Sequence, residues 1–209
     1  MQILLIAATA KEIEPFRTVN PDFDILITGV GVPATTYHLQ KRLLQVGYDL
    51  VIQAGIAGTF NKDIELGQTV LVKQDCFGDL GIEEKENFSS LFENGFADSN
   101  EFPFENGWLI NTNEVLNQYS LLPVKAVTVN KVSDSILQKQ QLIKQFNADI
   151  ESMEGAALHY VCLQENIPFI QIRSISNYVG ERDKTSWKMQ EAIENLHIEL
   201  QNLINELIN

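Results

Sequence analysis

Short apolar runs alternate with longer amphipathic segments along this chain. The runs that predict strands are Ile3–Ala8, Phe23–Thr28, Leu50–Ala54, Thr69–Lys73, Val124–Val129, Ala148–Glu151 and Phe169–Ile175. Several are continuously apolar, which is typical of strands covered on both faces. Helical periodicity marks Ala10–Thr18, Pro33–Val46, Glu114–Ser120, Ile136–Phe146, Met153–Glu165 and Lys184–Ile208. This alternation predicts a single α/β domain over residues 1–209, with a central, mostly parallel, twisted sheet flanked by helices.

The segment from Gly78 to Gly107 breaks the alternation. It contains many acidic residues, together with phenylalanines at positions 88, 92, 96, 102 and 104. Irregular segments of this length are usually functional or disordered, and the phenylalanines argue against disorder. Two interpretations stay open: a lid or oligomer contact, or an irregular excursion with its own small apolar cluster.

Charge and cysteine usage exclude several classes of function. The net charge of -13 argues against binding to nucleic acid or to an anionic membrane surface. Cys76 and Cys162 form no CxxC motif, which favours a reducing compartment in which both thiols are buried. The apolar N-terminal run lacks a basic flank and is too short to span a bilayer. We therefore expect a cytoplasmic protein, and no histidine–cysteine spacing suggests a metal.

Two glycine motifs follow predicted strands. Gly29-Val-Gly31-Val-Pro-Ala34 matches the dinucleotide-binding pattern G-x-G-x-x-A, but the next strand does not end in the acidic residue that would contact a ribose. A tight strand-to-helix turn beside a ligand is the better interpretation. Gly55-Ile-Ala-Gly58 predicts a second turn, which either lets the backbone approach a ligand or binds nothing.

Three polar side chains lie where predicted strands end and helices begin, which is the edge at which open α/β sheets bind ligands. Glu12 lies in a first helical turn, where it could stabilise the helix dipole or accept a proton from water. Glu154 also lies in a first turn and could bind a vicinal diol, and Gly155 beside it would leave room for a ligand. Asn177 ends a strand, and its carboxamide suits the N7–O6 edge of a 6-oxopurine or simply turns the chain.

With these residues in order, the whole chain resembles the nucleoside phosphorylase and nucleosidase superfamily. The segments Glu151–Ala157 and Ile175–Lys184 are most similar to the futalosine hydrolase subgroup. The related methylthioadenosine/S-adenosylhomocysteine nucleosidases share the Met-Glu pair but end the later strand in Ser-Asp, whereas this chain has Ser176-Asn177. Because an asparagine cannot act as an acid, the difference favours hypoxanthine over adenine as the leaving base.

The resemblance implies a role for each matching residue. Glu12 would be the general base that activates water, and Asn177 would bind the edge of the base. Glu154 would hold the ribose 2′- and 3′-hydroxyls, with Met153 against the sugar. The other implied contacts are the backbone of Ala57 and Gly58, and the side chain of Arg182.

The resemblance also implies the partners. We expect a purine nucleoside as the small-molecule ligand, no cofactor and no metal, and a homodimer or higher homo-oligomer. Ile56 stands where a hydroxyl would help to hold phosphate, which favours water as the acceptor.

Three hypotheses of function follow. The first is hydrolysis of the N-glycosidic bond of futalosine, a step of menaquinone biosynthesis that releases hypoxanthine. The second is another purine-nucleoside cleaving enzyme, either a 6-oxopurine phosphorylase that depends on phosphate or an adenine-type nucleosidase. The third is a nucleoside-binding or NAD-binding module without hydrolysis, in which replacing Glu12 would leave no chemical defect.

Overall fold

Strands and helices alternate along the computed structural model, which describes residues 1–85, 87–181, 183 and 185–208. The elements are β1 (Ile3–Ala7), α1 (Ala10–Val19), β2 (Ile25–Ile27), α2 (Val32–Leu43), β3 (Leu50–Thr59), β4 (Thr69–Asp75), β5 (Gly81–Glu84), β6 (Asn87–Ser90), β7 (Leu109–Ile110), a 3₁₀ turn η1 (Glu114–Gln118), β8 (Leu122–Thr128), α3 (Ile136–Phe146), β9 (Ile150–Ser152), α4 (Gly155–Gln164), β10 (Phe169–Tyr178) and α5 (Met189–Ile208).

The main sheet is mostly parallel, as predicted, and part of it closes on itself. The pairs β1–β2, β1–β3, β3–β10, β4–β8 and β8–β9 are parallel, whereas β4–β10, β3–β9 and β4–β7 are antiparallel. Strands β3, β10, β4, β8 and β9 therefore form a ring, because β3 pairs with both β10 and β9. Strands β1 and β2 extend the sheet from the edge of β3 opposite β10, where β1 pairs with the first residues of β3 and β9 with its last two.

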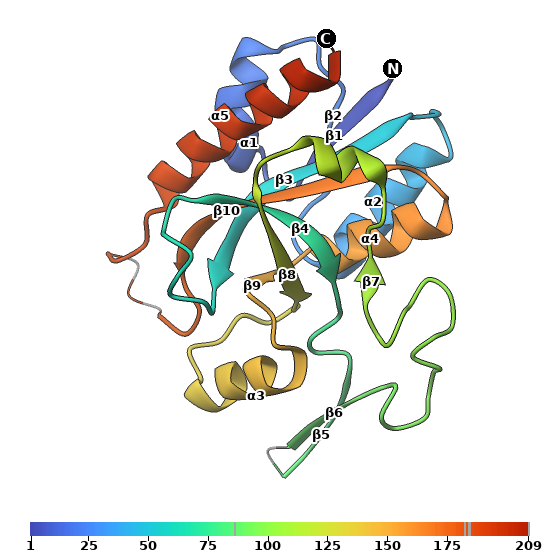
Figure 1. Ribbon diagram of the computed structural model, residues 1–209, viewed down its shortest axis with the longest axis vertical. Helices are drawn as coiled ribbons and strands as arrows, with labels where there is room; N and C mark the ends of the chain where they lie inside the picture. Colours follow the sequence, from blue (N-terminus) through green and yellow to red (C-terminus); the bar gives the residue numbers. More distant parts are fainter. Residues whose placement is uncertain (86, 182, 184, 209) are drawn as a thin grey trace.

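Helices cover both faces of the strands around β1 and β3 (Figure 1): α1 and α5 pack together on one face, and α2 and α4 on the other. Successive residues of β1 enter opposite cores. Leu5 packs in the cluster that contains Leu200 of α5, and Leu4 in the cluster that contains Leu158 of α4. The continuous apolar run of β1 is thus explained by burial on both faces.

The predicted elements are present, but several ends differ. Helix α4 begins at Gly155 rather than Met153, and β10 continues to Tyr178. Helix α5 begins at Met189, and Lys184, the expected start, lies outside the described residues. The predicted turn at Gly55–Gly58 is wrong, because β3 continues through these residues to Thr59. Strands β3 and β10 both run further than predicted, and the added residues of the two strands pair with each other. Tertiary pairing therefore overrides the local turn signal.

The segment between Gly78 and Gly107 forms its own small apolar cluster. It contains the hairpin β5–β6, and the rings of Phe92 and Phe104 lie 5.1 Å apart, with Phe104 also against Tyr160 of α4. Phe96 and Phe102 are exposed instead. The aromatic contacts support the interpretation of an excursion packed on the body.

Both cysteines are free and buried, as predicted. Burial raises the pKa of the Cys76 and Cys162 thiols, which keeps them protonated and unreactive. Among the described residues, no helix combines the length and apolar character that a membrane crossing requires.

Candidate functional site

The end of β3 brings the two predicted polar segments together. Gly58 pairs with Glu151 of β9 on one side and with Asn177 of β10 on the other. Strands β9 and β10 are therefore not neighbours here, and β3 lies between Glu151 and Asn177. A cavity of about 330 Å³ opens here, and its lining includes Glu12, Ala57, Gly58, Met153, Glu154 and Asn177. Arg182 lies outside the described residues.

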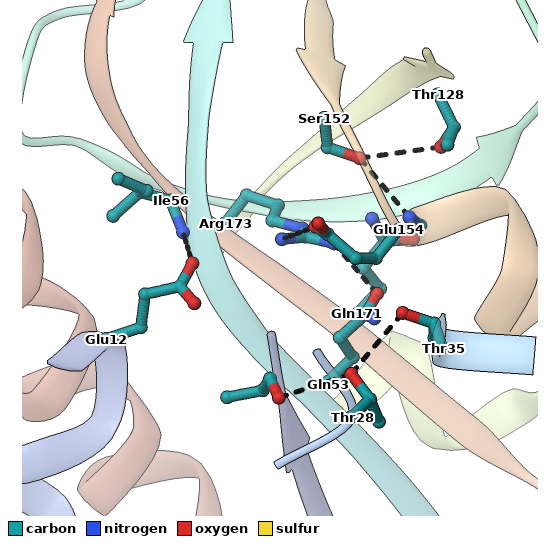
Figure 2. A network of polar contacts seen from close by, with 12 residues as sticks. Glu12, Thr28, Thr35, Gln53, Ile56, Thr128, Ser152, Glu154, Gln171 and Arg173 are labelled. Carbon is teal, nitrogen blue, oxygen red and sulfur yellow. Dashed lines mark hydrogen bonds and ion pairs between the residues drawn. The ribbon is translucent and has the colours of Figure 1, made fainter. Parts of the chain in front are cut away.

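Glu12 serves both its helix and the cavity. Its Oε2 accepts hydrogen bonds from the backbone N–H and the hydroxyl of Thr9, each at 2.9 Å, which caps the start of α1. Its Oε1 accepts the backbone N–H of Ile56 at 3.2 Å (Figure 2). Glu12 is 8% exposed and lines the cavity, so its carboxylate is held in place from two sides.

Glu154 is the N-cap residue of α4, but its side chain does not cap the helix. Oε1 accepts the N–H of Gly31 at 3.1 Å, and Oε2 lies 3.4 Å from Nη1 of Arg173. Burial raises the pKa of Glu154, whereas Arg173 and the Gly31 N–H lower it and nearby Glu12 raises it. The Gly29–Gly31 turn thus contacts Glu154 directly, and its place beside a ligand stays a prediction.

Arg173 is a site residue that the sequence analysis did not assign. It is 1% exposed in the middle of β10, and Nη2 donates to Oε1 of Gln53 at 2.9 Å. Its Nε has no partner among the described residues. An arginine inside an apolar strand was the available signal, because such a residue is almost never buried unless it is paired. Figure 2 shows its guanidinium beside Glu154.

Gly55 is needed because two charged side chains approach its backbone. A Cβ atom at this position would lie 2.5 Å from Nη1 of Arg173 and 2.9 Å from Oε1 of Glu12. The glycine is therefore explained by close side-chain approach rather than by a turn. Arg173 and Glu12 therefore both approach the backbone of β3 at Gly55.

The carboxamide of Asn177 is oriented by its neighbours in sequence. The hydroxyl of Ser176 lies 2.8 Å from Oδ1 of Asn177 and 3.2 Å from the carbonyl oxygen of Ala57, and it can donate to either. Nδ2 of Asn177 donates to the carbonyl oxygen of Tyr178 at 3.1 Å. One N–H and further acceptor capacity remain for a ligand.

A buried polar network lies behind this site. Asp75, at the end of β4, is fully buried and accepts hydrogen bonds from Thr128 at 2.9 Å and, more weakly, from Gln171 at 3.4 Å. A Cβ on Gly155 would overlap the Asp75 carboxylate and the Gln171 amide. The glycine therefore leaves room for this network, and the expectation that it leaves room for a ligand is wrong. Burial raises the pKa of Asp75 to about 7, partly offset by Thr128 and Arg173.

We expect the unfolding free energy of Asp75→Asn, relative to that of the wild type, to increase by about 1.4 kcal/mol for each unit by which the pH rises between about pH 4 and pH 7. The raised pKa means that the contribution of Asp75 is complete below its unfolded value of 3.8 and is lost as the pH rises through about 7. His159 has the opposite slope, because burial lowers its pKa to about 4. Urea unfolding of both proteins from pH 5 to 8 isolates Asp75, and a constant difference would contradict the expectation.

A second, larger cavity of about 490 Å³ lies beyond Ser133, which lines both cavities. Its lining includes Asp79, Lys131 and Gln138. Glu154 and Glu12, which are both buried carboxylates, line the first cavity and not the second. Buried ionisable side chains in the lining indicate a functional site better than the volume of a cavity does, so we assign the site to the first cavity.

Comparison with known proteins identifies relatives across most of the chain. A futalosine hydrolase from Thermus thermophilus is 28% identical over 187 residues, which cover 88% of this chain and 82% of that protein. A 5′-methylthioadenosine/S-adenosylhomocysteine nucleosidase from Buchnera aphidicola is 26% identical over 193 residues, which cover 88% of this chain and 74% of that protein.

Solved structures share the fold. A Helicobacter pylori methylthioadenosine nucleosidase variant, crystallised with 5′-methylthioadenosine in its active site, superposes with a TM-score of 0.81 at 18% identity, covering 98% of each chain. A Helicobacter pylori futalosine hydrolase gives 0.79 at 18% identity, covering 98% of this chain and 97% of that one. The sequence pattern described as the phosphorylase superfamily matches residues 25–209. The chain belongs to the phosphorylase superfamily.

Proposed function

We propose that this protein hydrolyses the N-glycosidic bond of futalosine and releases hypoxanthine and dehypoxanthine futalosine. The observation that carries the proposal is that two kinds of group line one cavity. These are the buried carboxylates of Glu12 and Glu154, the second of which is paired with Arg173, and the neutral carboxamide of Asn177. The 28% identity to futalosine hydrolases supports the choice of substrate.

The sugar side has the groups that ribose chemistry needs. Glu154 binds the 2′- and 3′-hydroxyls, and its negative charge stabilises the oxocarbenium character that develops as the bond breaks. Glu12 accepts a proton from the attacking water, whose oxygen bonds to C1′, and general-base action of this kind contributes ~10²–10⁴-fold. Arg173 keeps Glu154 ionised, because its positive charge offsets the cost of burial.

The base side suits a 6-oxopurine. The electron pair of the broken N9–C1′ bond passes to the purine, where Asn177 donates one N–H to O6 and accepts from a protonated N7 through Oδ1. Asn177 has no acidic proton to give, so the proton on the base comes from solvent. An adenine ring presents an amino group instead of O6, and the amide donor would then face a donor.

The remaining walls of the cavity suit a substrate with a bulky 5′ extension that carries a carboxylate. Trp187, Met189 and Ile193 line it on the side of α5, and Lys11 lines it on the side of α1. An indole ring can contact an aromatic group, and a lysine can neutralise a carboxylate. Inosine lacks this extension and serves as the comparison substrate.

Release of the free base from a panel of nucleosides tests the proposal. The purified protein is incubated with futalosine, inosine and methylthioadenosine, each with and without inorganic phosphate, and the free base is quantified. We expect phosphate-independent release of hypoxanthine from futalosine, slower release of hypoxanthine from inosine, and slower release of adenine from methylthioadenosine. Release only from inosine with phosphate would instead identify a phosphorylase and overturn the proposal.

Asn177→Asp should shift the preference toward adenine. A carboxyl group can donate a proton to N7 of a leaving adenine, but it loses the amide donor that contacts O6. We expect the ratio of kcat/KM for methylthioadenosine to that for futalosine to rise by at least about 10-fold, because a mispaired polar group is strongly discriminated. Asn166→Asp, at the exposed end of α4, is the matched control and should leave the ratio unchanged. An unchanged ratio in Asn177→Asp would remove Asn177 from base recognition.

A further inference from the structure

The predicted ribose-binding pair, Met153 and Glu154, directly precedes the first turn of α4, and this turn lacks the usual cap. The first N–H groups of a helix need acceptors from outside the helix, and an N-cap side chain normally supplies one. Here the N-cap residue is Glu154, whose carboxylate is turned to Gly31 and Arg173 and accepts no hydrogen bond from its own helix. Other groups must therefore stabilise this turn.

Two hydroxyls from neighbouring strands supply the missing acceptors. The N–H of Gly155 donates to Oγ of Ser152 at 3.3 Å, and the N–H of Ala156 donates to Oγ1 of Thr128 at 2.8 Å. Thr128 lies at the end of β8 and is fully buried. Figure 2 shows Ser152 and Thr128 facing each other. Their hydroxyl oxygens lie 3.5 Å apart.

Asp75 determines which way these hydroxyls point. A threonine hydroxyl has one hydrogen, so it can accept from the helix only if that hydrogen is bound elsewhere. Oγ1 of Thr128 donates its hydrogen to Oδ1 of Asp75 at 2.9 Å, and the N–H of Cys76 also donates to this oxygen, at 2.8 Å. The lone pairs of Thr128 are then free for the N–H of Ala156 and for the hydroxyl of Ser152.

We propose that Asp75 is a positioning residue of the site, which acts through Thr128 and Ser152 on the first turn of α4 and so holds Met153 and Glu154 against the ribose. Asp75 is fully buried and does not line the cavity, so it acts without touching the ligand. The close approach of Asp75 to Gly155 explains why the residue after Glu154 is a glycine. The kinetic part of this inference rests on the proposed function, and the structural part does not.

Kinetic variants test this chain of hydrogen bonds from Asp75 through Thr128 and Ser152 to the first turn of α4, which we call the relay. Asp75→Leu and Thr128→Val each remove one link, and we expect each to lower kcat/KM for futalosine by at least about 10-fold, because small displacements of a positioning group are costly. Asp75→Asn keeps an oxygen for Thr128 and Cys76, so it should stay within about 3-fold of the wild type. If Asp75→Asn lowered kcat/KM as much as Asp75→Leu does, the oxygen that accepts from Thr128 would not be the cause, and the relay would be contradicted.

The double variant Asp75→Leu/Thr128→Val separates a relay from general destabilisation. If both residues act through one chain of hydrogen bonds, the double variant should be about as impaired as either single variant, because the second change removes a link that is already broken. Effects that multiply would contradict the relay. Asp24→Leu is the matched control: it breaks the partly exposed contacts to Arg42 and Tyr48, and should leave kcat/KM unchanged.

Amide hydrogen exchange tests the structural part without any substrate. In Asp75→Leu and Thr128→Val, we expect the Gly155 and Ala156 amides to lose at least about 10-fold of their protection, relative to the same amides in Asp24→Leu. Unchanged protection in both variants would overturn the inference. If the wild type does not cleave futalosine but the exchange result holds, the proposed function fails while the relay stands.

Discussion

Glu12→Gln should abolish nearly all hydrolysis while the nucleoside still binds. Glutamine has nearly the same shape but cannot accept a proton from water, so we expect kcat to fall by ~10²–10⁴-fold. The amide nitrogen of glutamine is a donor, and it would face either the N–H of Ile56 or the N–H and hydroxyl of Thr9, which are donors too. The lost cap should lower the unfolding free energy by about 1 kcal/mol.

Single-turnover release of hypoxanthine and calorimetric titration with the nucleoside measure the two effects separately. Glu14→Gln is the matched control, because Glu14 lies on the same helix, is exposed and, among the described residues, forms an ion pair only with Arg17. It should retain full activity. A Glu12→Gln protein that cleaves at the wild-type rate would exclude Glu12 as the base. A wild type that binds the nucleoside without cleaving it would favour the binding-module hypothesis.

Arg173→Met should cost about 3–5 kcal/mol of unfolding free energy at neutral pH, because it leaves Glu154 buried without its partner. The pKa of Glu154, which burial already raises, would rise further without Arg173. A raised carboxyl pKa contributes stability at low pH that is lost as the pH rises through it. The variant should therefore recover part of the loss as the pH is lowered.

The double variant Arg173→Met/Glu154→Gln tests the cause of this loss. With both charges removed, most of the stability should return, because a neutral pair avoids the cost of one isolated buried charge. Arg42→Met is the control: its ion pair with Asp24 is partly exposed and should cost at most about 1 kcal/mol. Urea unfolding of the four proteins at pH 5 and pH 7 gives the comparison. A double variant as unstable as Arg173→Met would assign the loss to packing rather than to charge.

Much of the fold could be predicted because its signals are local. The apolar run of β1 and the periodicity of α3 each reflect burial of one face or both, and the observed bounds of α3 are the predicted ones. The predicted turn at Gly55–Gly58 is wrong because the cause of the glycine is not local. A glycine that forms a turn cannot be told in the sequence from a glycine that makes room for a neighbouring side chain, and Arg173 is 118 residues away from Gly55 along the chain.

The site residues show the same division. Glu12, Met153, Glu154 and Asn177 stood out because they lie at the junctions of strands and helices, and they line one cavity. Arg173 stands inside a strand, and its importance depends on Glu154 lying beside it, which strand pairing decides.

The sequence by itself determined the α/β alternation, the buried strands and the chemical types available for a site, because these depend on residue type and local spacing. The tertiary structure decided that β3 separates Glu151 from Asn177, that Arg173 is paired with Glu154, and that Asp75 lies under the start of α4. The physical reason is that hydrogen bonding and desolvation act between neighbours in space, and closing the ring of strands makes neighbours of residues far apart in the chain. The carboxylates and the carboxamide that line one cavity, and on which the proposed function rests, are such neighbours.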